Sequence, residues 1–205
     1  MKKKISFGLI AVILFAGFIL VNSSIVVTYP NEYTVIKQFG RIEKIYETPG
    51  LSMKIPFIQT TEKIEKEILL YDLAVSDVMT KDKKSMIADC FVLWEIEDPY
   101  KYTQTLSAQK SNAEFRIDTI VYNSLKNVIS SLSQEEVISG RDGELAQAIQ
   151  DNIGDTLEQY GIKLLAVETK SLDLPDENKS AVYERMISER NNIAATYQAE
   201  GQEEA

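Results

Sequence analysis

Few side chains in this sequence can carry chemistry, and one pair, Ser52 and Lys54, has the composition of a catalytic dyad. The 205-residue chain contains no histidine, which removes the commonest general base and the serine–histidine and cysteine–histidine nucleophile pairs. A serine–lysine pair is the hydrolase chemistry that remains. Residues two apart on a strand share a face. Because Ser52 and Lys54 alternate with the apolar residues 51, 53 and 55, they are expected on the outward, polar face. The sequence therefore disfavours catalysis.

The other reactive groups also favour structure over chemistry. Cys90 is the single cysteine, so no intrachain disulfide can form, and its place in an apolar row is typical of a small buried hydrophobe. The carboxylate pairs Glu135–Glu136 and Glu203–Glu204 lie in polar surroundings. No cysteine spacing suits a metal, and the scattered glycines form no phosphate loop. We expect no enzyme activity, no cofactor and no metal, and the net charge of −9 disfavours nucleic acid.

An uncharged apolar run over residues 5–21 follows Lys2, Lys3 and Lys4. As a helix of about 17 residues it spans roughly 25 Å, and residues 25–27 can supply the turn still needed for a bilayer core of about 30 Å. The lysines before the run predict a cytoplasmic N-terminus. The alternative is a signal peptide cleaved after residues 21–23, although the run exceeds the usual apolar region of about 7–15 residues. The predicted anchor residues are Ile5, Leu9, Ile13, Phe18 and Val21.

Period-two patterns after the anchor predict strands. Residues 33–39 form one strand that Gly40 closes, and residues 42–46 can pair with it. After the turn at residues 49–50, four apolar residues alternate on one face: Leu51, Met53, Ile55 and Phe57. The alternation favours a strand that packs against a core. A second interpretation stays open, in which this edge lies against the membrane surface beside the anchor.

The clearest strand covers residues 86–96 and carries a wholly apolar row on one face. After Pro99 the apolar period changes from 2 to 3.6, and a stripe of apolar residues from Ala113 to Leu132 predicts a helix. Ser133 and Glu136 have the spacing of a capping box. A further helix over residues 145–160 ends at Gly161, and residues 162–172 predict a last strand.

The final stretch, from Pro175 to Ala205, predicts a helix with Pro175 at its favoured first position. Only a thin apolar line runs along this polar helix, which indicates packing side by side with other helices as a coiled coil. The candidate oligomer interface consists of Val182, Met186, Ile193 and Tyr197.

Four stretches of the chain carry a family resemblance. The most specific is Pro49-Gly50-Leu51-Ser52-Met53-Lys54-Ile55-Pro56-Phe57-Ile58, and the others cover residues 32–41, 79–99 and 188–205. Together they resemble the band 7 (SPFH) superfamily, which includes stomatin, prohibitin, flotillin and the bacterial HflK and HflC proteins. The HflC type fits best because only Met1 to Lys4 precede the predicted anchor.

The resemblance implies an α+β chain of four parts. Residues 1–27 form the cytoplasmic N-terminus and transmembrane anchor, residues 28–99 a β-rich first SPFH subdomain, residues 100–174 an αβ second subdomain, and residues 175–205 the start of a long coiled-coil helix. Since family members continue beyond the point matching Ala205, the chain is expected to be a fragment or a shortened relative.

The function implied by the resemblance is a membrane scaffold without enzyme activity. Such proteins alternate with an HflK-like partner in a large hetero-oligomer on the outer face of the bacterial inner membrane. That assembly regulates the access of substrates to the membrane-bound AAA protease FtsH. The alternative is a stomatin-like organiser of membrane microdomains, a homo-oligomer without a protease partner.

Overall fold

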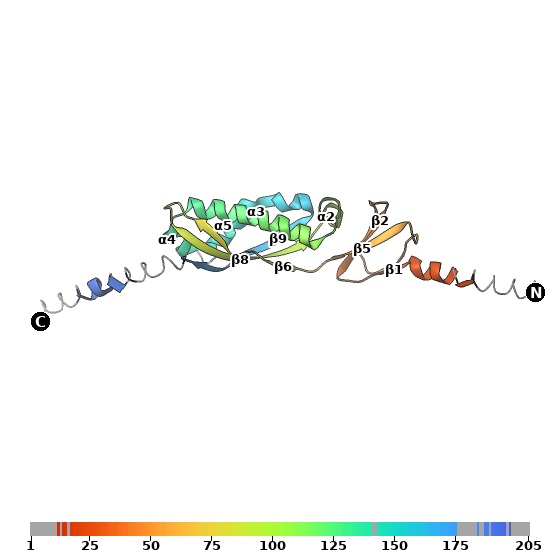
Figure 1. Ribbon diagram of the computed structural model, residues 1–205, viewed down its shortest axis with the longest axis horizontal. Coiled ribbons are helices and arrows are strands. Elements are labelled where there is room, and N and C mark those ends of the chain that lie inside the picture. The colour runs from red at the N-terminus through yellow and green to blue at the C-terminus, as the bar shows by residue number, and fades with distance from the viewer. Residues whose placement is uncertain are drawn as a thin grey trace, which may run out of the picture. The chain divides into compact units, whose positions relative to one another are not determined.

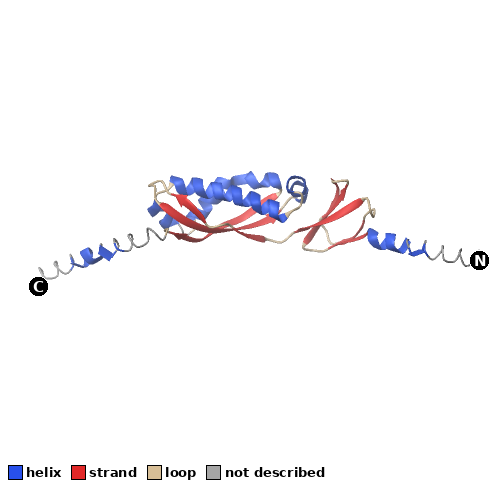
Figure 2. Cartoon of the chain, viewed as in Figure 1, coloured by secondary structure: helices blue, strands red, loops and turns tan. Residues whose placement is uncertain are grey.

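The computed structural model describes residues 17–140 and 143–175, together with residues 12, 14, 15, 184, 187, 188, 190–195 and 197. Antiparallel sheets and helices make up these parts, so the predicted α+β class is confirmed (Figures 1 and 2). The strands are β1 (Ile25–Thr28), β2 (Glu32–Gln38), β3 (Arg41–Tyr46), β4 (Gly50–Met53), β5 (Gln59–Glu65), β6 (Leu69–Asp72), β7 (Ser76–Met79), β8 (Ser85–Ile96) and β9 (Ile162–Asp173). The helices are α2 (Pro99–Leu106), α3 (Lys110–Ser131), α4 (Gln134–Ser139), α5 (Glu144–Ile153) and the 3₁₀ helix η2 (Gly154–Tyr160).

The chain divides into two compact units, each built from three separate stretches. Unit 1 comprises residues 1–71, 92–120 and 153–166, and unit 2 comprises residues 72–91, 121–152 and 167–205. The strands β8 and β9 and the helix α3 each contribute residues to both units.

Unit 1 contains a three-stranded antiparallel sheet in the order β3-β2-β5 and a two-stranded sheet of β1 and β4. A tight turn joins β2 to β3, with Phe39 at φ 50° and Gly40 at φ 82°. Positive φ at both central residues is the geometry that matches the twist of a two-residue hairpin. The predicted hairpin, and the role of Gly40 in closing its first strand, are confirmed.

Unit 2 packs helices against one face of a sheet. In its part of β8, Ser85 to Ala88 pair with β7, and the helices α3 and α5 lie over the strands (Figure 1). The core side chains of this unit share complete or nearly complete burial: Val78, Met86, Ala88, Cys90, Val121, Leu125, Ile129, Val137, Leu145 and Ile149.

The strand β8 has the alternation predicted for residues 86–96. Every second side chain is buried, from Met86 to Ile96, and none of the six is more than 4% exposed. Asp98 then caps α2 by accepting hydrogen bonds from the backbone N–H groups of Tyr100 and Lys101, with Pro99 at the start of the helix. The predicted stop of the strand before Pro99 is confirmed.

Several helix signals are confirmed, and one helical stretch differs from the prediction. Ser133 and Glu136 form the predicted capping box at the start of α4. The helix predicted from the apolar stripe over residues 113–132 is confirmed by α3. The preceding helix α2 ends where Ser107 and Ala108 both have positive φ. The predicted helix over residues 145–160 turns into the 3₁₀ helix η2 at Gly154, whose φ is +50°.

Part of the predicted membrane anchor and of the last helix lies outside the described residues. This applies to Ile5, Leu9 and Ile13, and to Val182 and Met186. Phe18 and Val21 are helical and exposed. Within the residues that the structure describes, no helix combines the length and apolarity needed to cross a bilayer.

Candidate functional site

An exposed apolar surface, here called the apolar face, occupies one side of the β1–β4 pair and the loop that follows it. In the antiparallel register Ile25 lies opposite Met53, and Val27 lies opposite Leu51. Side chains that are directly opposite share one face of a sheet, and these four are exposed, Leu51 by 80% and Met53 by 73%. The apolar face consists of Ile25, Val27, Leu51, Met53, Ile55, Phe57 and Ile58.

The opposite side of the same pair faces into unit 1. Val26 and Thr28 are buried, and the Thr28 hydroxyl donates to the hydroxyl of Thr34 at 2.9 Å. The Ser52 hydroxyl donates to the Val26 carbonyl at 3.4 Å. The expectation that Ser52 and Lys54 point outward is therefore wrong, because the polar residues of this strand are half-buried while its apolar residues face outward.

The loop after β4 holds Phe57 at its tip. The backbone N–H of Ile55 donates to the Gln59 side chain at 2.8 Å, and the N–H of Gln59 donates to the Ile55 carbonyl at 3.0 Å. Phe57 has φ 69° and is 88% exposed. The strand ends at Met53, and each of the four alternating apolar residues is exposed by more than half. The interpretation in which Leu51, Met53, Ile55 and Phe57 pack against a core is therefore wrong.

A hydrogen bond joins this loop to the end of the N-terminal helix. The N–H of Lys54 donates to the Ser24 carbonyl at 2.8 Å. The described residues before Ser24 include seven exposed large apolar side chains: Val12, Leu14, Phe15, Phe18, Ile19, Leu20 and Val21. Large exposed apolar surfaces mark sites of interaction with membranes or partners, and here the helix and the apolar face meet at Ser24.

The residues considered for catalysis are engaged in local contacts. The Lys54 amine donates to the Thr61 hydroxyl at 3.1 Å, away from the contact that Ser52 makes with Val26. Burial raises the pKa of the Cys90 thiol, which makes it a poor nucleophile. Within the described part of the chain, no group of Cys, Asp and Glu side chains is placed to hold a metal ion.

Along the last helix, two of the predicted interface residues are described. Ile193 and Tyr197 are helical, with Ile193 42% and Tyr197 70% exposed. Both are thus available for contact with another chain.

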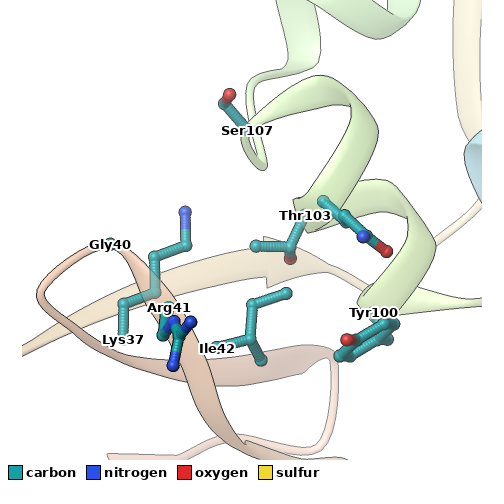
Figure 3. A pocket seen from close by; sticks show the side chains of 8 residues that line it. Lys37, Gly40, Arg41, Ile42, Tyr100, Thr103 and Ser107 are labelled. Atoms are coloured by element: carbon teal, nitrogen blue, oxygen red, sulfur yellow. The ribbon is translucent and has the colours of Figure 1, made fainter.

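A second feature of unit 1 is a pocket of about 440 Å³ between the β2–β3 hairpin and α2 (Figure 3). It is lined by Lys37, Gly40, Arg41, Ile42, Tyr100, Thr103, Gln104 and Ser107. The pocket could not be predicted from the sequence, since the hairpin and the helix are far apart in the chain.

Comparison with known families agrees with this architecture of small antiparallel sheets followed by helices. The model of the SPFH domain / Band 7 family matches residues 26–203. The chain therefore belongs to the SPFH/Band 7 family, and the resemblance noted in its sequence is confirmed.

Within this family the chain is similar to proteins named HflC. It is 28% identical to protein HflC of Haemophilus influenzae, covering 94% of this chain and 69% of that protein. It is 25% identical to protein HflC of Buchnera aphidicola subsp. Acyrthosiphon pisum, covering 92% and 67%. It is also 25% identical to the modulator of FtsH protease HflC of Escherichia coli K12, covering 97% and 73%.

Proposed function

We propose that the protein is a membrane-attached scaffold that regulates the access of substrates to a membrane-bound AAA protease of the FtsH type. The observation that carries this proposal is the similarity over 97% of the chain to a protein named modulator of FtsH protease HflC. The regulation is steric and involves no chemical step by this chain. We further infer an HflK-like partner within one large hetero-oligomer at the bacterial inner membrane.

The exposed apolar surfaces of unit 1 support attachment to a membrane. The apolar run over residues 5–21 serves as the anchor in this proposal, with the N-terminus in the cytoplasm and the rest of the chain on the outer side. The apolar face would then lie against the outer leaflet, because Lys54 is tied to Ser24 at the end of the helix. Apolar side chains buried in the interface add binding free energy to that of the anchor.

The last helix supplies the lateral contacts in this proposal. Ile193 and Tyr197, together with Val182 and Met186, would pack against the helices of neighbouring subunits. Contacts of this kind can be weak one by one, since each subunit of a ring is held by several of them at once.

The experiment is purification of the tagged chain in a gentle detergent, with mass spectrometry of the bound proteins and a measurement of particle size. We expect a very large particle that contains an HflK-like protein and an AAA protease. The variant Ile193→Asp should reduce the particle size, and Asn191→Asp, which adds the same charge on the same helix, should leave it unchanged. Recovery of neither partner would rule out the protease link.

The alternative is a stomatin-like organiser of membrane microdomains. The extent of the apolar face supports this function as well. This function requires lipid contact and self-association but no protease. A small homo-oligomer without bound partners, still attached to membranes, would favour it over the protease scaffold.

A further inference from the structure

The pocket between the β2–β3 hairpin and α2 has the composition of an anion site. All eight of its lining residues belong to unit 1. Two are cations, Lys37 and Arg41, four are neutral and polar, and no carboxylate lines the pocket. The whole chain carries a net charge of −9, so a pocket lined by cations and neutral polar groups stands out from its surroundings.

The two cations differ in their availability. Lys37 forms an ion pair with Glu62 at 2.5 Å, so its charge is largely balanced. Arg41 is exposed, and none of the ion pairs between described residues includes it. A guanidinium offers several N–H donors in a planar fork, which fits two oxygens of a phosphate or carboxylate at once. Arg41 is therefore the cation that a ligand would engage first.

The α2 side of the pocket carries neutral polar side chains. Figure 3 shows the two cations on the hairpin and Tyr100, Thr103 and Ser107 on the side of α2. The Thr103 hydroxyl is buried and already donates to the Pro99 carbonyl at 2.7 Å. The hydroxyls of Tyr100 and Ser107 and the amide of Gln104 thus remain as donors.

We propose that this pocket binds a phosphate ester, with Arg41 holding the phosphate oxygens and the donors of α2 holding the hydroxyl groups of the alcohol part. The neutral donors favour such a ligand over a simple carboxylate, because they match an ester that carries further oxygens. The volume of about 440 Å³ falls within the usual range for small-ligand sites. A soluble glycerol phosphate and the headgroup of an anionic phospholipid share this chemistry. The site goes beyond the proposed scaffold function and does not depend on it.

The test is calorimetric titration of the full chain in detergent with inorganic phosphate and with glycerol 1-phosphate. We expect glycerol phosphate to bind more tightly than phosphate. Arg41→Gln should weaken the binding about tenfold or more, since hydrogen bonds to charged groups are worth that much. Lys44→Gln is the matched control, because Lys44 is an exposed residue of the same strand that does not line the pocket, and it should leave the affinity unchanged.

Glu62→Gln should tighten the binding, because Lys37 is then free for the ligand. Arg41→Lys keeps the charge but loses the fork, so we expect an intermediate affinity. Thermal unfolding of each variant shows whether it is folded, and the gain in Glu62→Gln keeps the proposal testable if Arg41→Gln is unstable.

Vesicles distinguish the two sources of the ligand. Binding of the chain to phosphatidylcholine vesicles is compared with and without phosphatidylglycerol. A gain from phosphatidylglycerol that is lost in Arg41→Gln and kept in Lys44→Gln assigns the lipid headgroup, whereas titration binding without such a gain assigns the soluble ester. The proposal is overturned if neither phosphate compound binds, or if Lys44→Gln weakens binding as much as Arg41→Gln does.

Discussion

The strands β8 and β4 share one sequence pattern and have opposite environments. Both alternate apolar side chains at every second position. In β8 the apolar row is buried, and on its other face Lys163 pairs with Glu95 at 3.3 Å and Lys170 pairs with Asp89 at 2.7 Å. In β4 the apolar residues Leu51 and Met53 are exposed, and Ser52 lies on the inner side.

The difference shows that alternation specifies a strand without specifying which face is buried. The strand β8 pairs with β6, β7 and β9, and helices cover its apolar row. Among the described strands, β4 pairs with β1 alone. The rest of unit 1 lies against the side of this pair that carries Val26 and Thr28. An apolar row that the fold itself leaves uncovered is available for a lipid surface or a partner.

The largest expected effect is on stability and comes from the buried row of β8. Trp94→Ala removes a fully buried ring and should lower the free energy of unfolding by about 3–5 kcal/mol, because a cavity remains. Denaturant unfolding measures the change. Phe57→Ala removes an aromatic ring of the apolar face and should change the same quantity by less than about 0.5 kcal/mol. Equal losses would mean that the apolar face is part of a core.

The next effect concerns the junction that follows β8. Gly161 has φ +73°, and a Cβ atom there would lie 2.2 Å from the Asp98 carbonyl oxygen and 2.8 Å from the Tyr102 nitrogen. Gly161→Ala should therefore lower the free energy of unfolding by about 2 kcal/mol or more, because the backbone is strained and the start of α2 is displaced.

Gly40→Ala is the matched control for this junction. Gly40 also has positive φ, at +82°, but no atom of the described residues lies within 4 Å of the position that a Cβ would take. In Gly40→Ala the backbone strain alone should lower the free energy of unfolding by roughly 1 kcal/mol. If both variants lose the same stability by thermal unfolding, the close approach of the backbone at Gly161 contributes nothing.

Features that depend on neighbouring residues could be predicted from the sequence. The capping box of Ser133 and Glu136, the cap at Gly161, the turn at Gly40 and the buried row of β8 all depend on residues a few positions apart, and all are confirmed. The short helix α2 was not predicted separately, because it ends at Ser107 and Ala108, which adopt positive φ although neither is a glycine.

Features that depend on contacts between residues far apart in the chain could not be predicted from the sequence. The inward position of the half-buried Ser52 is set by the pairing of β4 with β1, which brings Ser52 opposite Val26. The pocket of Arg41 requires α2 to lie beside the β2–β3 hairpin, and no spacing in the sequence encodes that. Two of the four candidate interface residues, Ile193 and Tyr197, are exposed, as a contact surface requires. Their role in oligomer contacts stays a prediction.

A smaller effect is expected at the turn that precedes β8, and it depends on pH. Hydrogen bonds from Thr80, then from Lys84 and the backbone N–H of Gln134, lower the pKa of Asp82 to about 2. A carboxylate whose pKa is lower in the folded state stabilises the fold above its ordinary pKa near 3.8, and this contribution is lost as the pH falls toward 2. Asp82→Asn should therefore be less stable than the parent chain at neutral pH.

The measurement for Asp82 is thermal unfolding between neutral pH and about pH 2. The difference in melting temperature between the parent chain and Asp82→Asn should be constant down to about pH 4. It should shrink as the pH falls from there toward 2. Asp77→Asn is a control from the same hairpin, because the Asp77 carboxylate accepts a hydrogen bond from Ser85 without contacting α4. A difference that persists at the lowest pH would mean that the Asp82 charge has no part in holding the turn to α4.

The smallest expected change in stability, and the sharpest contrast with β8, belongs to the apolar face. Trp94 is the only tryptophan, and its indole N–H has no hydrogen-bond partner within the described residues, so Trp94→Phe leaves a chain without tryptophan and with most of its packing. Phe57→Trp in that background places a fluorophore on the apolar face. In brominated-lipid vesicles its emission should be quenched and shifted to the blue. The free energy of unfolding should stay within about 0.5 kcal/mol of that of Trp94→Phe alone.

The parent chain is the control for this experiment, and with Trp94 buried in unit 1 it should show little quenching. Emission typical of water from the introduced tryptophan in attached protein would contradict contact of this face with lipid and would leave a protein partner as its occupant.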